Sequence, residues 1–519
     1  MSLLKSASTV SLFTLLSRIT GLVRDQIMAA SFGATALTDA FNVAFRIPNL
    51  LRRLFAEGAF SQAFVPILAA TREQRGDEAT HQLVDAVATV LFWALLVTVA
   101  LGVVGAPVIV WMIASGLTAF DEAVLMTRIM FPYIACMSLV ALGAGVLNTW
   151  RRFAVPAATP MLLNLSWIVA AWWLAPVFER HGVQPIYALA VGVMVGGISQ
   201  LAVQFWALSR LKMRPRLAFS PAGVGRAARD ETVRAVLRNM APALLGVGVA
   251  QLSLLINTQI ASHLAAGSVS WLTYADRLME FPTALLGVAL GVVLTPQLSA
   301  ARARGDTDAY SGMLDWGLRL TFLLALPCAA ALLVFAQPLV AVLFHYGKFT
   351  DIDVMKTSWA VMGWGVGLLG IIAVKILAPG YFARQDVRTP VKIAVVVLVC
   401  TQLLNVVLVP WLGHAALALS IGLGALINAT WLYLGLRRLG VYIPASGWWG
   451  LLLRGVLATA ALAGWLAWAA SALDWLGMQG QPLVRAGWMA AVLGSAALLY
   501  FGLLALSGIK LRQFARRSL

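Results

Sequence analysis

Long apolar runs follow one another along almost the whole chain, with short polar segments between them. A run of about 20 apolar residues is the length that crosses the hydrocarbon core of a membrane as a helix. The pattern therefore predicts an all-α integral membrane protein with about fourteen transmembrane helices. The predicted spans are residues 7–32, 35–70, 82–114, 122–149, 156–176, 185–209, 235–262, 270–300, 309–335, 353–379, 388–410, 413–437, 446–471 and 484–507.

Composition narrows the class further. Of the 519 residues, 61% are hydrophobic and 11% are charged, whereas soluble domains have about half and about a quarter. This excludes an ordinary soluble enzyme, a disordered chain and a fibrous one. The three cysteines lie inside apolar runs and the five histidines are scattered, so we expect neither a disulfide framework nor a metal site.

The chain is basic, with 38 Lys and Arg against 21 Asp and Glu. The basic residues gather in short loops that all fall on one side of a fourteen-span topology, which is typical of cytoplasmic loops rather than of nucleic-acid binding. We therefore expect both termini in the cytoplasm and no nucleic-acid partner. The loops carry Arg72 and Arg75, Arg151 and Arg152, the 210–234 segment, Arg302 and Arg304, Arg384 and Arg388, and Arg437 and Arg438.

Two parts of the sequence resemble each other at a separation of 230 residues. Pro66 corresponds to Pro296, and the pair Thr159-Pro160 corresponds to Thr389-Pro390. An even number of spans in each half makes the repeat parallel, which is a transporter architecture with a cavity between the halves. The predicted domains are a six-helix bundle (1–210), a basic cytoplasmic linker (211–234), a second six-helix bundle (235–438) and two extra helices (439–519).

Several charged residues fall inside the predicted spans. Each costs roughly 2.5–3.5 kcal/mol at the centre of a bilayer, so they should face a wet cavity or one another. On the second span, such residues recur at steps of three and four and share one helix face, and Pro48 should kink that helix. This face consists of Asp39, Asn42, Arg46, Asn49 and Arg53.

Arginine is in excess among these intramembrane charges, and its guanidinium recognises phosphate in a bidentate manner. The sequence therefore predicts an anionic, phosphate-bearing substrate, with the acids serving as ion-pair partners of a gate. A purely structural role is open for Arg46 and Glu57, and Asp315–Arg319 is predicted to be a surface pair. The substrate-binding candidates are Arg18, Arg24, Asn49, Arg52, Arg53, Arg277 and Lys375, and the gating candidates are Asp25, Asp39, Asp276 and Glu280.

Four long stretches carry a resemblance to a known family. They are SRITGLVRDQIMAASFG, TDAFNVAFRIPNLLRRLFAEGAFSQAFVP (38–66), YADRLMEFP (274–282) with the following LLGVALGVVLTPQLS, and LAPGYFARQDVRTPVKIA (377–394). In this order along the chain, they resemble the MurJ (MviN) lipid II flippases of the multidrug/oligosaccharidyl-lipid/polysaccharide exporter superfamily.

The resemblance implies fourteen helices, two six-helix bundles and alternating access in the bacterial cytoplasmic (inner) membrane. It implies movement of lipid II, the undecaprenyl-diphosphate-linked peptidoglycan precursor, from the cytoplasmic to the periplasmic leaflet. It also implies that the last two helices form a groove for the lipid tail. The family's important charged positions correspond here to Arg18, Arg24, Asp25, Asp39, Arg52, Arg53, Asp276, Arg277, Glu280 and Lys375.

The energy source is expected to be the membrane potential or an ion gradient, with no cofactor. Some superfamily members bind a cation at a carboxylate in span seven or eleven, but no acid lies between Arg238 and Asp276, and span 388–410 has none. This weakens the case for sodium coupling. No Walker motif is present, so ATP is not expected as a direct driver.

Other function classes fit less well. An exporter of amphipathic cations would need cavity acids rather than arginines, and an enzyme acting on polyprenyl phosphates would need an Asp-rich or His/Asp site. A scaffold would not need intramembrane arginines. Export of another amphipathic or polyprenyl-linked oligosaccharide stays open. We expect a monomer that binds lipid II and bilayer lipids, with contacts to the peptidoglycan-synthesis machinery left open.

Overall fold

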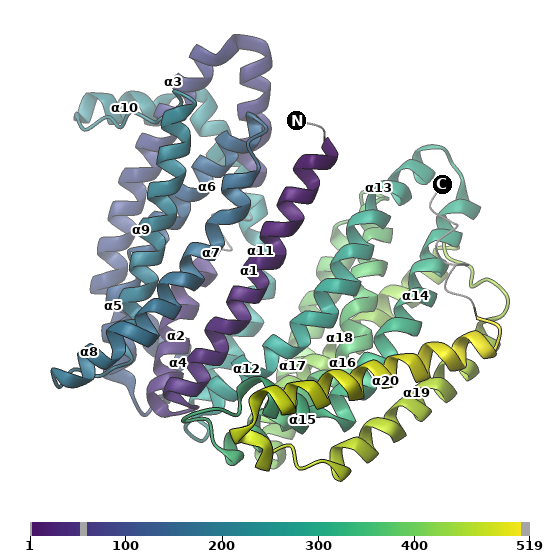
Figure 1. The fold of residues 1–519 in the computed structure, drawn as a ribbon. Coiled ribbons are helices and arrows are strands. Elements are labelled where there is room, and N and C mark those ends of the chain that lie inside the picture. Colours follow the sequence, from purple (N-terminus) through teal and green to yellow (C-terminus); the bar gives the residue numbers. More distant parts are fainter. Residues whose placement is uncertain (1–2, 52–59, 510–519) are drawn as a thin grey trace. The chain divides into compact units, whose positions relative to one another are not determined.

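The computed structural model describes residues 3–51 and 60–509, except for the side chains at 3–11, 62, 241–250, 288–290 and 292–293. All regular secondary structure in this part of the chain is helical (Figure 1), which confirms the predicted all-α class. The chain forms two compact units, Met1–Val269 and Ser270–Leu519.

The first unit contains eleven α-helices in its described part. Between α7 and α8 the chain makes a π-helical turn at Ala170–Leu174. The helices are α1 (Leu3–Phe32), α2 (Ala36–Leu51), α3 (Ser61–Val104), α4 (Ala106–Ala114), α5 (Phe120–Met130), α6 (Tyr133–Thr149), α7 (Ala154–Val169), α8 (Ala175–Arg180), α9 (Tyr187–Arg210), α10 (Pro221–Arg229) and α11 (Glu231–Ser262).

The core of this unit is built from α3, α6 and α9, whose apolar side chains pack together around Phe64, Val146 and Leu208. Helix α7 packs against both α9 and α1. This contact matters for function because it brings a polar face of α1 against α7. Helix α11 packs on α2, α3 and α4 and so belongs to this unit.

The second unit begins within α12, and a π-helical turn at Thr283–Val288 leads from α12 into α13. A short 3-10 turn, Gly477–Gly480, precedes the last helix. The helices are α12 (Ser268–Pro282), α13 (Ala289–Ala303), α14 (Thr307–Val334), α15 (Ala336–Phe344), α16 (Asp351–Phe382), α17 (Arg388–Leu412), α18 (His414–Arg438), α19 (Trp448–Ala472) and α20 (Pro482–Leu506).

Helices α16 and α18 make the closest contact in the second unit. A Cβ atom added at Gly367 would lie 2.0 Å from the Cα atom of Gly422. Such small residues let the backbones of membrane helices approach each other, where van der Waals packing drives association. The buried side chains of Leu314, Ile376 and Leu432 continue this core towards α14.

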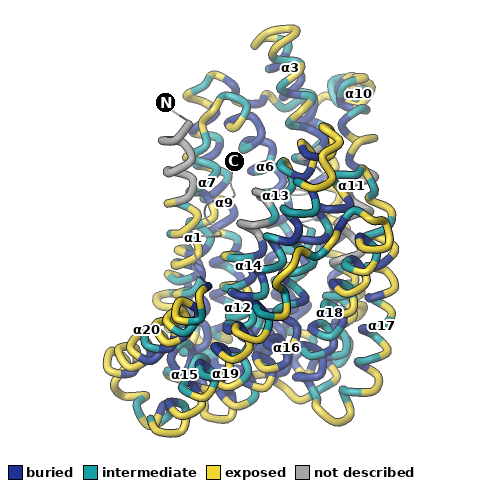
Figure 2. The backbone as a smooth tube through the Cα atoms, turned by 90° about the vertical axis from the view of Figure 1, so that its right-hand side faces the viewer, coloured by how far each residue is buried: buried dark blue, intermediate teal, exposed yellow. Residues whose placement is uncertain are grey.

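The last two helices pack on each other and on the rest of the second unit. The Tyr500 hydroxyl donates a hydrogen bond to the Leu323 carbonyl oxygen at 2.6 Å, and Gly455 lies close to the Phe322 ring. Long exposed stretches run along α17, α19 and α20 (Figure 2), whose most apolar windows are only 17%, 33% and 28% buried. Apolar surface of this extent is typical of helices that face lipid.

Ten helices in the described part of the chain are long and apolar enough to cross a membrane. They include all of the predicted spans from 309–335 onwards. Predicted spans 7–32, 35–70, 235–262 and 270–300 are not among the ten. These segments carry the intramembrane charges or include residues outside the described ones, and their described parts are helical.

The helix boundaries repeat at the predicted separation. Ala106–Ala114 and Ala336–Phe344 are 230 residues apart at both ends, and α1 and α11 end at Phe32 and Ser262. The duplication is therefore visible in the helices as well as in the sequence. The division at residues 210, 234 and 438 stays a prediction.

Three local expectations need correction or comment. The polar segment 210–234 is not only a loop, because it contains α10. The predicted surface pair is wrong, because Asp315 is 4% exposed. Its carboxylate binds Arg319 at 2.7 Å and accepts hydrogen bonds from Tyr442 and Trp448 at 2.9 and 2.7 Å. Pro48 lies inside α2, and the kink expected there stays a prediction.

Candidate functional site

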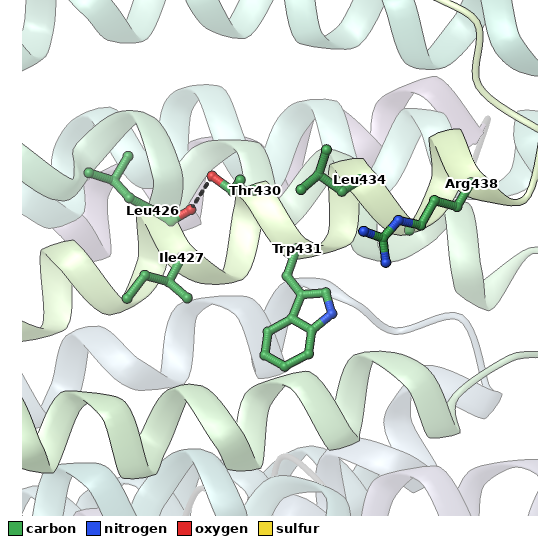
Figure 3. A pocket seen from close by; sticks show the side chains of 7 residues that line it. Leu426, Ile427, Thr430, Trp431, Leu434 and Arg438 are labelled. Carbon is green, nitrogen blue, oxygen red and sulfur yellow. Dashed lines mark hydrogen bonds between the residues drawn. The ribbon is translucent and has the colours of Figure 1, made fainter.

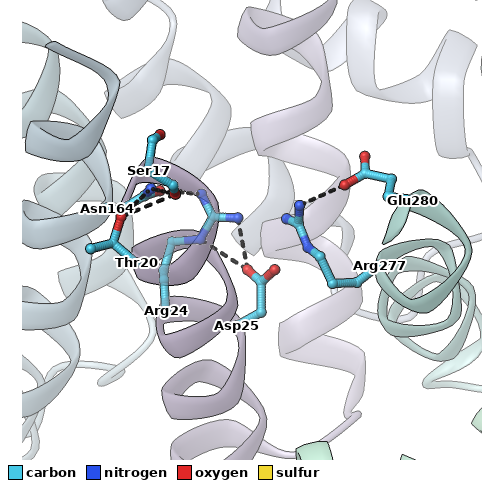
Figure 4. Close-up of polar contacts among 7 residues, drawn as sticks. All are labelled: Ser17, Thr20, Arg24, Asp25, Asn164, Arg277 and Glu280. Atoms are coloured by element: carbon cyan, nitrogen blue, oxygen red, sulfur yellow. Dashed lines mark hydrogen bonds and ion pairs between the residues drawn. The ribbon is translucent and has the colours of Figure 1, made fainter. Parts of the chain in front are cut away.

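Arg24 and Asp25 form an ion pair on α1. The Nε and Nη2 atoms of Arg24 both donate to Asp25 Oδ1, at 2.9 and 2.7 Å (Figure 4). Both side chains are only 12% exposed. Arg18, six residues earlier than Arg24 on the same helix, is exposed.

Helix α7 holds the other side of the Arg24 guanidinium. Arg24 Nη1 donates to Asn164 Oδ1 at 3.1 Å, and Asn164 Nδ2 donates back to α1 at the Ser17 carbonyl and the Thr20 hydroxyl (Figure 4). The guanidinium carbon lies 4.3 Å from the centre of the Trp167 ring. Arg24 is thus held by Asp25, Asn164 and Trp167, a set that we call the Arg24 cradle.

Trp167 ties the cradle to a third helix. Its ring lies 5.0 Å from Phe41 and 5.1 Å from Phe45 on α2, both edge-to-face, and Trp167 is 3% exposed. Aromatic packing of this kind fixes the ring, and the fixed ring in turn fixes the plane of the cation above it. The cradle therefore orients Arg24 rather than merely neutralising it.

The ligand that Arg24 can bind depends on which pair of its N–H groups is already occupied. A guanidinium binds a carboxylate or a phosphate through pairs of N–H groups. Asp25 uses the Nε–Nη2 edge, which is an edge that a phosphate would take. An arriving phosphate would thus compete with Asp25 while Asn164 and Trp167 kept the guanidinium in place.

Asn164 and Trp167 are not among the site residues that the sequence predicts. Asn164 leaves a weak signal, because it is a polar residue inside the predicted span 156–176. Trp167 leaves none, since tryptophan is common in membrane helices and two others follow at 172 and 173. Their partner on α1 is about 140 residues away in the chain.

On α2, the acidic candidate Asp39 is 3% exposed. Its Oδ2 atom accepts a hydrogen bond from the backbone N–H of Gly267 at 2.7 Å, and Gly267 has a φ of 97°, which favours glycine. Nearby, Arg46 donates to the Thr258 hydroxyl on α11. Asp39 therefore fixes the turn after α11. Asn49, further along α2, is half-buried.

On α12, Arg277 and Glu280 form the pair that their spacing predicts. Arg277 Nη1 lies 2.8 Å from Glu280 Oε2, with the two side chains 32% and 47% exposed. Asp276 is half-buried beside them. Figure 4 draws the bond between Arg277 and Glu280.

Lys375 lies on α16, half-buried. Its aliphatic stem packs closely against Gly287, where an added Cβ atom would lie 2.6 Å from Lys375 Cδ. Among the described residues it has no hydrogen bond or ion pair. A cation held by its stem in this way keeps its ammonium available for an anion.

Two of the predicted substrate-binding residues, Arg52 and Arg53, lie outside the described residues, as does Glu57. The structure brings Arg24 and Asp25 together in the first unit, and Arg277 and Glu280 in the second. Asp39 accepts a hydrogen bond from the backbone of Gly267.

Helices that repeat at a separation of 230 residues, together with the ten described helices that are long and apolar enough to cross a membrane, define the class as a multi-pass membrane transporter. The fold agrees with a solved MATE-family multidrug transporter of the MOP superfamily in an inward-facing conformation. That comparison has a TM-score of 0.65 and 16% identity, over 83% of this chain and 97% of the other. A solved structure titled lipid II flippase MurJ, inward closed conformation, matches with a TM-score of 0.77 and 22% identity, over 96% and 98%.

The sequence comparisons identify the family within this class. The family model described as "Lipid II flippase MurJ" matches residues 28–482. A protein named lipid II flippase MurJ from Burkholderia cenocepacia is 54% identical over all of both chains. A probable lipid II flippase MurJ from Vibrio cholerae is 36% identical over 98% of this chain and 97% of its own. The chain belongs to the MurJ lipid II flippase family.

Proposed function

We propose that this chain is a lipid II flippase. It moves the diphosphate-linked peptidoglycan precursor from the cytoplasmic to the periplasmic leaflet by alternating access, and it is a transporter rather than an enzyme. The observation that carries the proposal is full-length identity of 54% to a protein of that name. The Arg24 cradle supports it, because an oriented, buried arginine suits a phosphate-bearing headgroup.

The diphosphate is bound by basic side chains from both halves of the sequence. Arg24 provides an oriented guanidinium, Arg277 another, and Lys375 a point charge. Arg18, Asn49, Arg52 and Arg53 complete the set that the sequence predicts. Binding displaces Asp25 from the guanidinium edge of Arg24, so that the carboxylate serves as a stand-in for phosphate when the site is empty.

The acids act as a gate under this proposal. Asp25 and Glu280 pair with arginines in the described state, and substrate binding releases them. A ligand shifts a conformational equilibrium only through its differential affinity for the two states. The exchange of carboxylate for diphosphate supplies such a difference. Asp39 and Asp276 are proposed to act in the same gate.

The same proposal covers the energy source of transport and the location of the chain in the cell. The chain lies in the bacterial cytoplasmic membrane with both termini in the cytoplasm, it acts as a monomer, and it uses no cofactor. The membrane potential or an ion gradient drives the cycle. Helices α19 and α20 provide an apolar groove for the polyprenyl tail, whose burial is favourable by about 0.8 kcal/mol per CH₂.

The test is transport by the purified full chain in proteoliposomes. Lipid II is placed in one leaflet, and its appearance in the other is measured by its accessibility to a membrane-impermeant reagent. We expect protein-dependent appearance of lipid II. The same vesicles receive a polyprenyl-linked oligosaccharide without the peptide. Transport of that lipid but not of lipid II would favour export of another polyprenyl-linked substrate, and transport of neither would contradict the proposal.

A further inference from the structure

A groove follows one face of the last three turns of α18 (Figure 3). Its volume is about 570 Å³, within the range of small-molecule sites. The groove lies within the second unit and contains none of the residues assigned above to transport. It is lined by Leu426, Ile427, Thr430, Trp431, Leu434, Gly435 and Arg438.

The length of the groove suits one bilayer leaflet. Leu426 and Arg438 are twelve residues apart on a continuous helix, which corresponds to about 18 Å at a rise of about 1.5 Å per residue. Half of the hydrocarbon core is about 15 Å thick. The groove therefore extends from the end of a membrane span to about the depth of the bilayer midplane.

The side chains that line the groove favour an apolar ligand. Its side chains are mostly aliphatic or aromatic, and the Thr430 hydroxyl donates to the Leu426 carbonyl oxygen at 2.8 Å (Figure 3). That bond satisfies the only hydroxyl in the wall. A hydrocarbon chain would bury apolar surface here without leaving a polar group unpaired.

The end of the groove at Arg438 favours an anionic group. The Arg438 guanidinium and the Trp431 indole project from the same face of α18 (Figure 3). Neither the guanidinium nor the indole N–H has a hydrogen-bond or ion-pair partner in the described part of the chain. The guanidinium at the end of the groove and the indole N–H seven residues earlier on the helix match the phosphate and the ester oxygens of a glycerolipid.

The charge around this end has the same sign. Helices α17 and α18 are joined through Gly413 alone and pack along each other, so the start of α17 and the end of α18 lie at the same face of the membrane. Basic residues outnumber the single acid there. They are Arg384, Arg388, Lys392, Arg437 and Arg438, against Asp386.

We propose that this groove is a binding site for an anionic glycerophospholipid of the bilayer. One acyl chain lies along Leu426–Leu434, and the phosphate is bound by Arg438. Clusters of basic residues at the ends of membrane helices attract anionic headgroups. A zwitterionic lipid gains less, because its own ammonium group meets the surrounding arginines.

The test is native mass spectrometry of the full chain, purified in detergent and supplied with phosphatidylglycerol or phosphatidylcholine of equal chain length. We expect retained phosphatidylglycerol adducts and at least several-fold fewer phosphatidylcholine adducts. R438Q should lose the preference for phosphatidylglycerol, and T430W, which fills the groove, should lose both adducts. The matched controls are R226Q, which changes an exposed arginine on α10, and L101W, which changes an exposed leucine on α3; both should bind as the parent protein does.

A second measurement keeps the proposal falsifiable if a variant does not fold. A photoactivatable phosphatidylglycerol is cross-linked to the unaltered chain, and the labelled peptides are mapped. Labelling concentrated at residues 426–438 supports the site. Equal retention of both lipids, unchanged binding by R438Q, or labelling spread evenly over α17, α19 and α20 would overturn it. Displacement of phosphatidylglycerol by a polyprenyl diphosphate, but not by excess phosphatidylcholine, would assign the groove to the substrate tail instead.

Discussion

The two halves of this protein share helix boundaries but differ at the Arg24 cradle. In the first half, α1 and α7 meet through a buried ion pair, an amide and an aromatic ring. At the positions 230 residues later, the side chains are all aliphatic. Arg24, Asp25, Asn164 and Trp167 correspond to Leu254, Leu255, Ala394 and Val397. The repeated helices therefore do not need the cradle, and its cost in the membrane points to function.

A second difference concerns α9 and α18. On α9, the face equivalent to the lipid groove is filled: Gly197 lies against Tyr133, and Gln204 lies against Gly143 and donates to the Thr159 hydroxyl at 3.1 Å. On α18 that face is open, with Ile427 and Leu434 at the corresponding positions. A duplicated scaffold thus carries a packed polar contact in one half and an apolar groove in the other.

The largest effect is expected from Arg24→Ala. Removing a charge-assisted contact to the diphosphate should cost about 1.5–3 kcal/mol, which corresponds to roughly a ten- to hundredfold slower transport of lipid II in proteoliposomes. Arg24→Lys should recover only part of the rate, because the planar fork is lost. The control is Arg226→Ala, which removes an exposed arginine on α10. Parent-like transport by Arg24→Ala would remove the cradle from the mechanism.

Adding the charge to the other half should harm the fold without helping transport. Leu254→Arg places an arginine at the position of α11 that corresponds to Arg24, where the sequence has no counterparts of Asn164 and Trp167. It should destabilise insertion by roughly 2.5–3.5 kcal/mol, measured as the membrane-inserted fraction in cells. Leu254→Met is the control for volume. Normal insertion of Leu254→Arg would mean that this position faces water, and the contrast between the halves would fail.

A smaller effect is expected from the aromatic wall of the cradle. Trp167→Leu removes the cation–π contact, worth about 0.5–2 kcal/mol, and should slow lipid II transport by a few-fold up to about thirtyfold. Trp167→Phe should retain much of the rate. Val397→Leu, at the equivalent position of the second half, should have no effect. If Trp167→Leu and Trp167→Phe behave alike, the ring only fills space.

Much of the fold could be predicted from the sequence, because an apolar run long enough to cross a bilayer forms a helix. The 230-residue repeat and the Arg277–Glu280 pair also follow from spacing along the chain. Contacts between distant segments could not be predicted in this way. The buried cluster around Asp315 needs Tyr442 and Trp448 from more than 120 residues away, and hydropathy treats Asp315 as the polar start of a span.

The smallest effect is expected at the residue that follows α15, which differs from the residue that follows the corresponding helix α4. The residue after α15 is His345, and the residue after α4 is Ser115, which does not titrate in the physiological range. His345 Nε2 lies 2.9 Å from Asp351 Oδ1, and its Nδ1 lies 3.5 Å from Nη1 of the fully buried Arg485. An arginine donor at Nδ1 favours the neutral ring, in which Nε2–H donates to Asp351.

Burial, with help from Arg485 and against the attraction of Asp351, lowers the pKa of His345. The neutral ring is therefore favoured in the folded state. Its contribution to stability is fully present above the ordinary pKa of about 6.5 and is lost as the pH falls below that value. His345→Gln should reduce the drop in Tm between pH 7.5 and pH 5.5, measured on the detergent-solubilised protein. An equal drop in both proteins would show that His345 does not contribute.

The central claim is that the Arg24 cradle binds the diphosphate of the substrate. Its most direct test is equilibrium binding of a short-chain polyprenyl diphosphate to the purified protein, for the parent chain and for Arg24→Ala, Asp25→Asn and Leu254→Met. We predict at least tenfold weaker binding for Arg24→Ala, tighter binding for Asp25→Asn because its competing charge is gone, and no change for Leu254→Met. Unchanged affinity in Arg24→Ala, or weaker binding in Asp25→Asn, would contradict the claim.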